Sequence, residues 1–164
     1  MELVADNRVV HAGTYNAGGT SVAAALATIE RLADPDFAAH ARMRDLGTRL
    51  RAGLEAAATD RGLRLVTQGP GPVFFSWFLA EGGVETYRDH LRADAAGYAR
   101  FAELLLGEGV RVIPAGRWYM AAAHTQEHVE RTIEAAGVAM ASSRPRSRSR
   151  SRADARMTSV ARAL

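Results

Sequence analysis

Few side chains in this sequence of 164 residues have a type and a spacing that could support chemistry. His124 and His128 are four residues apart, a spacing that could bring two imidazoles to one metal ion. No carboxylate–histidine motif of the zinc-protease kind surrounds them, so a role in capping a helix is the favoured interpretation. Ser76 and His90 belong to no nucleophile motif. There is no cysteine, which excludes disulfides, thiolate nucleophiles and cysteine-based metal sites.

The basic residues have two notable features. All 21 of them are arginine, so these 164 residues contain no lysine to form a Schiff base with a carbonyl compound. Seven of the arginines follow residue 143, where only Asp154 opposes them, whereas residues 1–143 carry a net charge of −3. The high isoelectric point therefore belongs to the tail and not to the body of the chain.

Apolar spacing, glycine and proline predict the elements that must position any site. A short strand from Val9 is expected to run into a glycine-rich turn, followed by a helix capped by Thr20 or Ser21. The expected helices cover residues 22–33, 35–61, 84–91, 95–106 and 124–141. The later expected strands cover residues 63–68, 73–79, 110–114 and 118–122. The first two of these later strands are predicted to pair as a hairpin around residues 69–72. The pattern indicates an α+β fold with helices packed on one mostly antiparallel or mixed sheet.

Two segments, about 100 residues apart, carry a family resemblance. The first is His11–Ala17, followed by an alanine-rich helix, and the second runs from Gly109–Pro114 through Arg117–Tyr119 to Ala123–Glu127. In this order they resemble the C-terminal half of class III, pyridoxal-phosphate-dependent aminotransferases, nearest to glutamate-1-semialdehyde 2,1-aminomutase. The resemblance covers residues 8–141. It implies the C-terminal small domain of a fold-type I transferase.

The resemblance implies a chemistry and a set of roles. Family members are dimers in which pyridoxal phosphate (PLP) forms a Schiff base with a lysine and acts as an electron sink. Thr14 would donate hydrogen bonds to a phosphate oxygen of the partner subunit's cofactor, with Gly13 allowing the close backbone approach. Arg117, eight residues before Thr125, would bind the carboxylate of a small amino-acid or keto-acid substrate through its planar guanidinium. Without the resemblance, Gly13 and Thr14 would be an ordinary strand-to-helix turn, and Arg117 a surface or sheet-edge arginine.

The sequence also departs from the family. The family usually continues this motif as Asn-Gly-Asn-Pro or Asn-Ala-Asn-Pro, whereas here Asn16 is followed by Ala17-Gly18-Gly19-Thr20. The Schiff-base lysine and the aspartate that faces the pyridine nitrogen lie upstream in the family. We therefore expect a C-terminal fragment that cannot catalyse transamination alone.

Three regions are expected. Residues 1–33 would be the end of the large cofactor-binding domain and a linking helix, residues 34–141 the small domain, and residues 142–164 an Arg/Ser-rich disordered tail. The alternative function is a non-catalytic domain that binds a protein partner or RNA through this tail. The tail lacks aromatic residues for base stacking, so no nucleic-acid partner is expected. Without a signal peptide or a long apolar run, a cytoplasmic location is the default, with no membrane partner.

Overall fold

The computed structural model describes residues 2–6, 8–10, 12–13, 15 and 18–143. The chain divides into two compact units, residues 1–42 and residues 43–164. The division falls within a helix. It does not test the three predicted regions, and the predicted disordered tail from residue 144 onward lies outside the described residues.

The first unit contains α1 (Glu2–Ala5) and α2 (Gly19–Ala33). The predicted strand from Val9 is wrong, because Val9 lies in a bend and no described residue of this unit pairs in a sheet. The predicted side-chain cap of α2 is also wrong: Gly18 occupies the N-cap position and no side chain bonds there. An apolar row along α2 stays exposed, with Ile29 62% exposed.

A turn delays the next helix, α3 (Ala39–Thr59), beyond the predicted start at Pro35. The Asp34 carboxylate accepts hydrogen bonds from the backbone N–H groups of Asp36 and Phe37, at 2.9 and 3.3 Å. Such Asx turns compete with helical hydrogen bonding, so the helix begins only after them.

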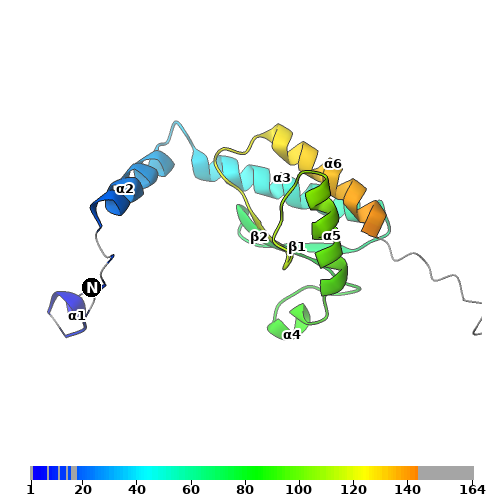
Figure 1. Cartoon of the computed structure of the whole chain (residues 1–164), viewed down its shortest axis with the longest axis horizontal. Coiled ribbons are helices and arrows are strands. Elements are labelled where there is room, and N and C mark those ends of the chain that lie inside the picture. The colour runs from blue at the N-terminus through cyan, green and yellow to red at the C-terminus, as the bar shows by residue number, and fades with distance from the viewer. Residues whose placement is uncertain (1, 7, 11, 14, 16–17, 144–164) are drawn as a thin grey trace, which may run out of the picture. The chain divides into compact units, whose positions relative to one another are not determined.

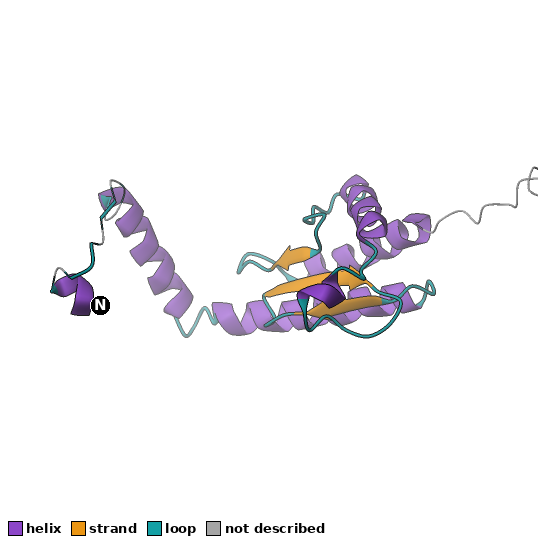
Figure 2. Cartoon of the chain, turned by 90° about the horizontal axis from the view of Figure 1, so that it is seen from below, coloured by secondary structure: helices purple, strands orange, loops and turns teal. Residues whose placement is uncertain are grey.

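The second unit is built on a three-stranded antiparallel sheet in the order β1-β2-β3 (Figure 1). Its further elements are β1 (Leu65–Gln68), β2 (Val73–Phe78), α4 (Tyr87–His90), α5 (Ala95–Gly107), β3 (Arg117–Tyr119) and α6 (Gln126–Ser143). The predicted hairpin and the α+β fold class are confirmed. Figure 2 shows the three strands as one layer with the long helices behind and beside them.

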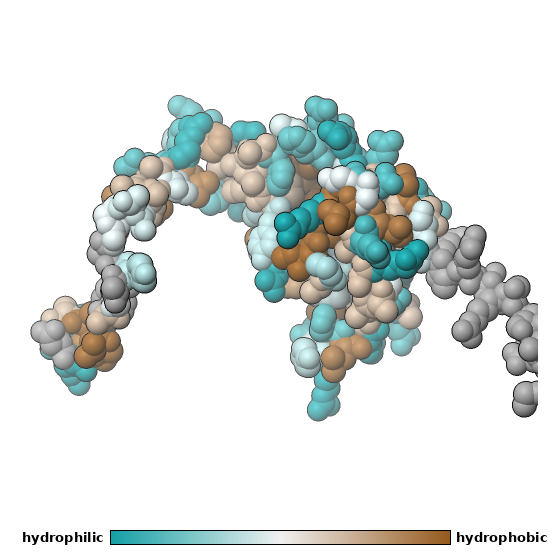
Figure 3. Space-filling view, viewed as in Figure 1, coloured by the Kyte–Doolittle hydropathy of each residue, from teal (hydrophilic) through white to brown (hydrophobic). Residues whose placement is uncertain are grey.

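The register divides the sheet into a core face and an outer face. On the core face Phe74 pairs with Trp118, and both are buried against residues of α3, α5 and α6. On the outer face Phe75 pairs with Arg117. In the space-filling view, apolar and polar side chains are interspersed over the visible surface (Figure 3).

One predicted strand, over residues 110–114, is wrong. Residues 110–113 are extended without ladder hydrogen bonds, and the strand that pairs with β2 is β3. Between them Gly116 adopts a φ of 91° and accepts a hydrogen bond from the Ser76 N–H at 2.9 Å. A Cβ at position 116 would collide with the Ser76 carbonyl oxygen, so only glycine fits this approach to β2. No helix in the described part of the chain is long and apolar enough to cross a membrane.

Candidate functional site

Arg117 occupies a defined place on the outer face of the sheet. Its guanidinium carbon lies 4.9 Å from the centroid of the Phe75 ring, within cation–π range. Its Nη1 donates a hydrogen bond of 3.2 Å to the hydroxyl of Tyr119. Because Arg117 and Tyr119 are two residues apart on β3, they point to the same side of the strand. The strand pairing therefore positions the guanidinium between two aromatic side chains.

The Phe75 ring is itself part of a stack along the outer face. Phe75 and Trp77 are parallel within 6°, with ring centroids 5.4 Å apart. His90 of α4 meets the Trp77 ring edge-on at 6.2 Å. α4 thus covers the Trp77 end of the face, while the Arg117 end remains exposed.

Arg117 has no acidic partner within the described residues. It borders an open hollow of about 440 Å³ together with Tyr119 and the segment from Arg111 to Pro114. An exposed guanidinium that is positioned by aromatic groups and not paired with an acidic side chain can donate hydrogen bonds to the carboxylate of a ligand.

The other two candidates are less defined. Gly13 is described, exposed and outside any helix or strand. Thr14 lies outside the described residues, as does His11, so their predicted roles stay predictions.

Of the two histidines near the start of α6, His128 caps the helix as predicted, whereas His124 bonds within the preceding turn. Thr125 N–H donates to His128 Nδ1 at 3.2 Å, and His128 N–H donates back to Thr125 Oγ1 at 3.3 Å. His124 Nδ1 accepts a hydrogen bond of 2.9 Å from the N–H of Ala121. In each ring Nδ1 therefore serves as the acceptor for a backbone N–H. No group of three potential metal ligands occurs among the described residues.

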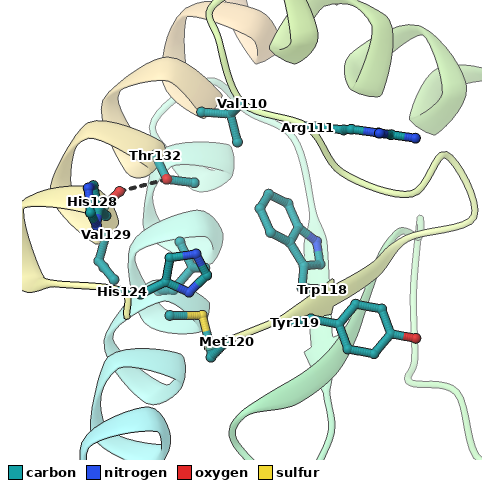
Figure 4. Close-up of a pocket in the computed structure, with 10 residues that line it drawn as sticks. Val110, Arg111, Trp118, Tyr119, Met120, His124, His128, Val129 and Thr132 are labelled. Atoms are coloured by element: carbon teal, nitrogen blue, oxygen red, sulfur yellow. Dashed lines mark hydrogen bonds between the residues drawn. The ribbon is translucent and has the colours of Figure 1, made fainter. Parts of the chain in front are cut away.

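These histidines border a small cavity of about 100 Å³ (Figure 4). Its other walls include the apolar side chains of Val110, Trp118 and Val129. The figure shows the hydrogen bond of 2.7 Å from the Thr132 hydroxyl to the His128 carbonyl oxygen. The cavity is too small for more than a few water-sized groups.

The chain is similar to known proteins in sequence and in fold. No protein-family model matches it. It is 35% identical over 138 residues to a glutamate-1-semialdehyde 2,1-aminomutase of Desulforudis audaxviator (strain MP104C). This alignment covers 82% of the chain and 31% of the aminomutase. The β-phenylalanine aminotransferase of Variovorax paradoxus superposes with a TM-score of 0.72 at 25% identity, over 84% of the chain and 32% of that structure. The PLP internal aldimine form of the FumI protein of Sphingopyxis sp. MTA144 superposes with a TM-score of 0.64 at 26% identity, over 84% of the chain and 30% of that structure.

The chain is a class III aminotransferase-like segment. Sequence and fold agree on this, since the chain is 35% identical to the aminomutase and 84% of it superposes on the β-phenylalanine aminotransferase. The segment spans about a third of the length of the relatives that it matches.

A buried hydrogen-bond network on the core face was not predicted from the sequence. On the core face, Trp118 Nε1–H donates hydrogen bonds to Ser76 Oγ at 2.8 Å and to the Tyr98 hydroxyl oxygen at 3.0 Å. The Ser76 and Tyr98 hydroxyl oxygens are themselves hydrogen-bonded at 2.6 Å. Burial raises the pKa of Tyr98 to about 12, because the phenolate would be desolvated. This network links β2, α5 and β3, so it fixes the strand that carries Arg117. Only the isolated Ser76 within an apolar strand could have signalled a buried polar partner.

Proposed function

We propose that the segment is the C-terminal portion of a PLP-dependent aminotransferase or glutamate-1-semialdehyde aminomutase-like enzyme. The complete enzyme transfers an amino group to or from a small carbonyl acid. The observation that carries this proposal is the 35% identity over 138 residues, supported by the superposition on transaminase structures.

The role proposed for this segment is to complete a site and not to run the chemistry. Gly13 and Thr14 bind a phosphate oxygen of the partner subunit's cofactor in a homodimer. Arg117 binds the substrate carboxylate, which its unneutralised guanidinium on the outer face supports. Two parallel hydrogen bonds from guanidinium to carboxylate would hold the acid in one plane.

The residues present do not fit the cofactor as a complete site. The sequence has no lysine, and Gly13 stands on an exposed stretch without a surrounding pocket in the described residues. PLP supplies electron-sink chemistry wherever it is bound. The segment alone is therefore proposed to be inactive.

A chimera tests the proposal. The matching 138 residues of the D. audaxviator aminomutase are replaced by those of this chain, and PLP absorbance is followed with alanine and with glutamate as amino donors. We expect the chimera to bind PLP and to accept an amino group. With Arg117→Gln, the KM for the carboxylate substrate should rise by about tenfold with a smaller change in kcat.

The isolated chain serves as the second arm. Incubation with PLP, borohydride reduction and mass analysis should give no specific adduct, since only the α-amine can react. Transamination by the isolated chain would contradict the proposed division of roles. A folded chimera that fails to bind PLP would contradict the proposed family function.

A further inference from the structure

The strand β1 lies at an edge of the sheet and could accept a further strand. Within the described residues it pairs only with β2. In an antiparallel pair, every second residue directs its backbone N–H and C=O away from the neighbouring strand. Thr67 is such a residue, because both of its backbone groups bond to side chains of α3. Leu65, two residues earlier, has the same orientation. Unpaired groups of this kind are a template for pairing with another chain.

Two side chains of α3 occupy this edge. The Glu55 carboxylate accepts hydrogen bonds from the Thr67 N–H at 2.8 Å and from the Thr67 hydroxyl at 2.6 Å. The Arg51 guanidinium donates to the Thr67 carbonyl oxygen and to the Thr67 hydroxyl, both at 3.0 Å. It also donates to the Gly69 carbonyl oxygen at 3.1 Å. Glu55 thus supplies the acceptor, and Arg51 the donors, that an added strand would supply.

The spacing of these two residues suits the task. Arg51 and Glu55 are four residues apart, so they lie one above the other on one face of α3. Both side chains are half-buried, and Thr67 is only 5% exposed. Arg49 of the same helix is exposed and pairs instead with Glu130 of α6, at 3.6 Å. The edge contact therefore belongs to Arg51 and Glu55 and is not general to the arginines of α3.

We infer that Arg51 and Glu55 cover the β1 edge, and that the partner they exclude is β1 of a second copy of this chain. Two β1 strands related by a two-fold axis at Val66 run antiparallel. In that arrangement Thr67 of each copy exchanges backbone hydrogen bonds with Leu65 of the other. The pairing joins the two sheets into one, and main-chain hydrogen bonds supply the affinity of such strand addition. The inference concerns this chain alone and does not depend on the proposed function.

Removing the cover in the 164-residue chain tests the inference. In the double variant Arg51→Ala/Glu55→Ala, sedimentation equilibrium at fixed ionic strength should show a discrete dimer. Its dissociation constant should be at least about tenfold lower than that of any self-association of the parent chain. Hydrogen exchange of the Thr67 amide should slow as the protein concentration rises, because the second copy then protects it. Arg49→Ala is the matched control, since it removes an arginine from α3 without uncovering β1, and it should behave as the parent chain does.

A further substitution separates strand pairing from a simple loss of stability. Val66 is half-buried on the outer face, opposite Trp77, and in the two-fold pairing it lies opposite Val66 of the second copy. Val66→Lys added to the double variant therefore sets two like charges against each other and should restore the association of the parent chain. A double variant that associates no more than the parent chain would overturn the inference. So would association, as dimers or as large aggregates, that persists with Val66→Lys, or equal dimerisation of Arg49→Ala.

Discussion

The two faces of the three-stranded sheet satisfy their polar groups in opposite ways. On the core face, Ser76, Tyr98 and Trp118 bond only to one another, and each is buried. On the outer face, the buried Nε1 of Trp77 has no partner among the described residues, and Arg117 has no acid. Buried polar groups in folded proteins are normally paired. The polar groups of the core face therefore satisfy one another within this segment, whereas the outer face still has an unpaired donor and an unpaired charge that could bind another group.

The strongest way to break this comparison is to truncate adjacent residues on opposite faces. Phe74→Ala should lower the free energy of unfolding by about 3–5 kcal/mol, because Phe74 is fully buried and leaves a cavity. Phe75→Ala should cost only about 1 kcal/mol, mainly the stack and the cation–π contact with Arg117. Urea unfolding measures both. Equal losses would show that the outer face is as well packed as the core.

Alkaline pH should disrupt the core face selectively. The pKa of Tyr98 is raised from 10.0 to about 12, so the folded state favours the neutral phenol. The stabilisation of the fold by the neutral Tyr98 phenol is complete below pH 10 and is lost as the pH rises towards 12. The free energy of unfolding should fall by up to about 3 kcal/mol over this range. Tyr98→Phe should remove this alkaline step in pH-dependent unfolding. The outer-face control, Tyr119→Phe, should retain it, and a step that persists in Tyr98→Phe would contradict the assignment.

The two tryptophans sharpen the comparison further. Trp118→Phe should cost about 2 kcal/mol, since it leaves a buried gap and deprives Ser76 and Tyr98 of their shared donor. Trp77→Phe should change stability by less than about 0.5 kcal/mol, because it also removes an unpaired buried donor. Thermal unfolding of the two variants checks the ranking. A larger loss for Trp77→Phe would mean that its indole N–H is satisfied in solution.

The smallest effect concerns the helix that covers one end of the outer face. The hydrogen bond from the Thr86 side chain lowers the pKa of Asp89, within a capping box that starts α4. Because the pKa of Asp89 is lowered in the folded protein, its carboxylate stabilises the fold at pH values above the ordinary pKa of 3.8. This stabilisation is lost as the pH falls below that value. Thr86→Ala should cost about 0.5 kcal/mol and speed amide exchange over residues 87–90. Unchanged exchange there would show that His90 and Trp77 alone hold α4.

Local sequence signals predicted the elements that depend on local physics. The Gly-Pro-Gly-Pro turn at residues 69–72 predicted the hairpin, and Gly69 and Gly71 adopt the positive φ angles that favour glycine. The start of α6 was predicted from Thr125 and His128, whose reciprocal hydrogen bonds involve only neighbours in the chain. Where a side chain competed with the helix, as Asp34 does, the predicted start was wrong by several residues.

The site was only half visible in the sequence. Arg117 was a candidate through the family resemblance, whereas no sequence signal marked Arg111, which borders the same hollow. Val110 to Ile113 have the composition of a strand, yet the edge of β2 is taken by Arg117–Tyr119, so the earlier segment finds no partner.

The sequence by itself determined the chemical limits of this protein: it has no lysine and no cysteine, and its excess positive charge lies after residue 143. It also determined the hairpin and the cap at the start of α6, since these need only neighbouring residues. Only the tertiary structure decided which strand completes the sheet, which side of it Arg117 faces, and that Arg111 joins it at one hollow. Pairing and side-chain direction depend on which edge of the sheet is available and on which residues the core buries, and neither is encoded in any local stretch of the chain.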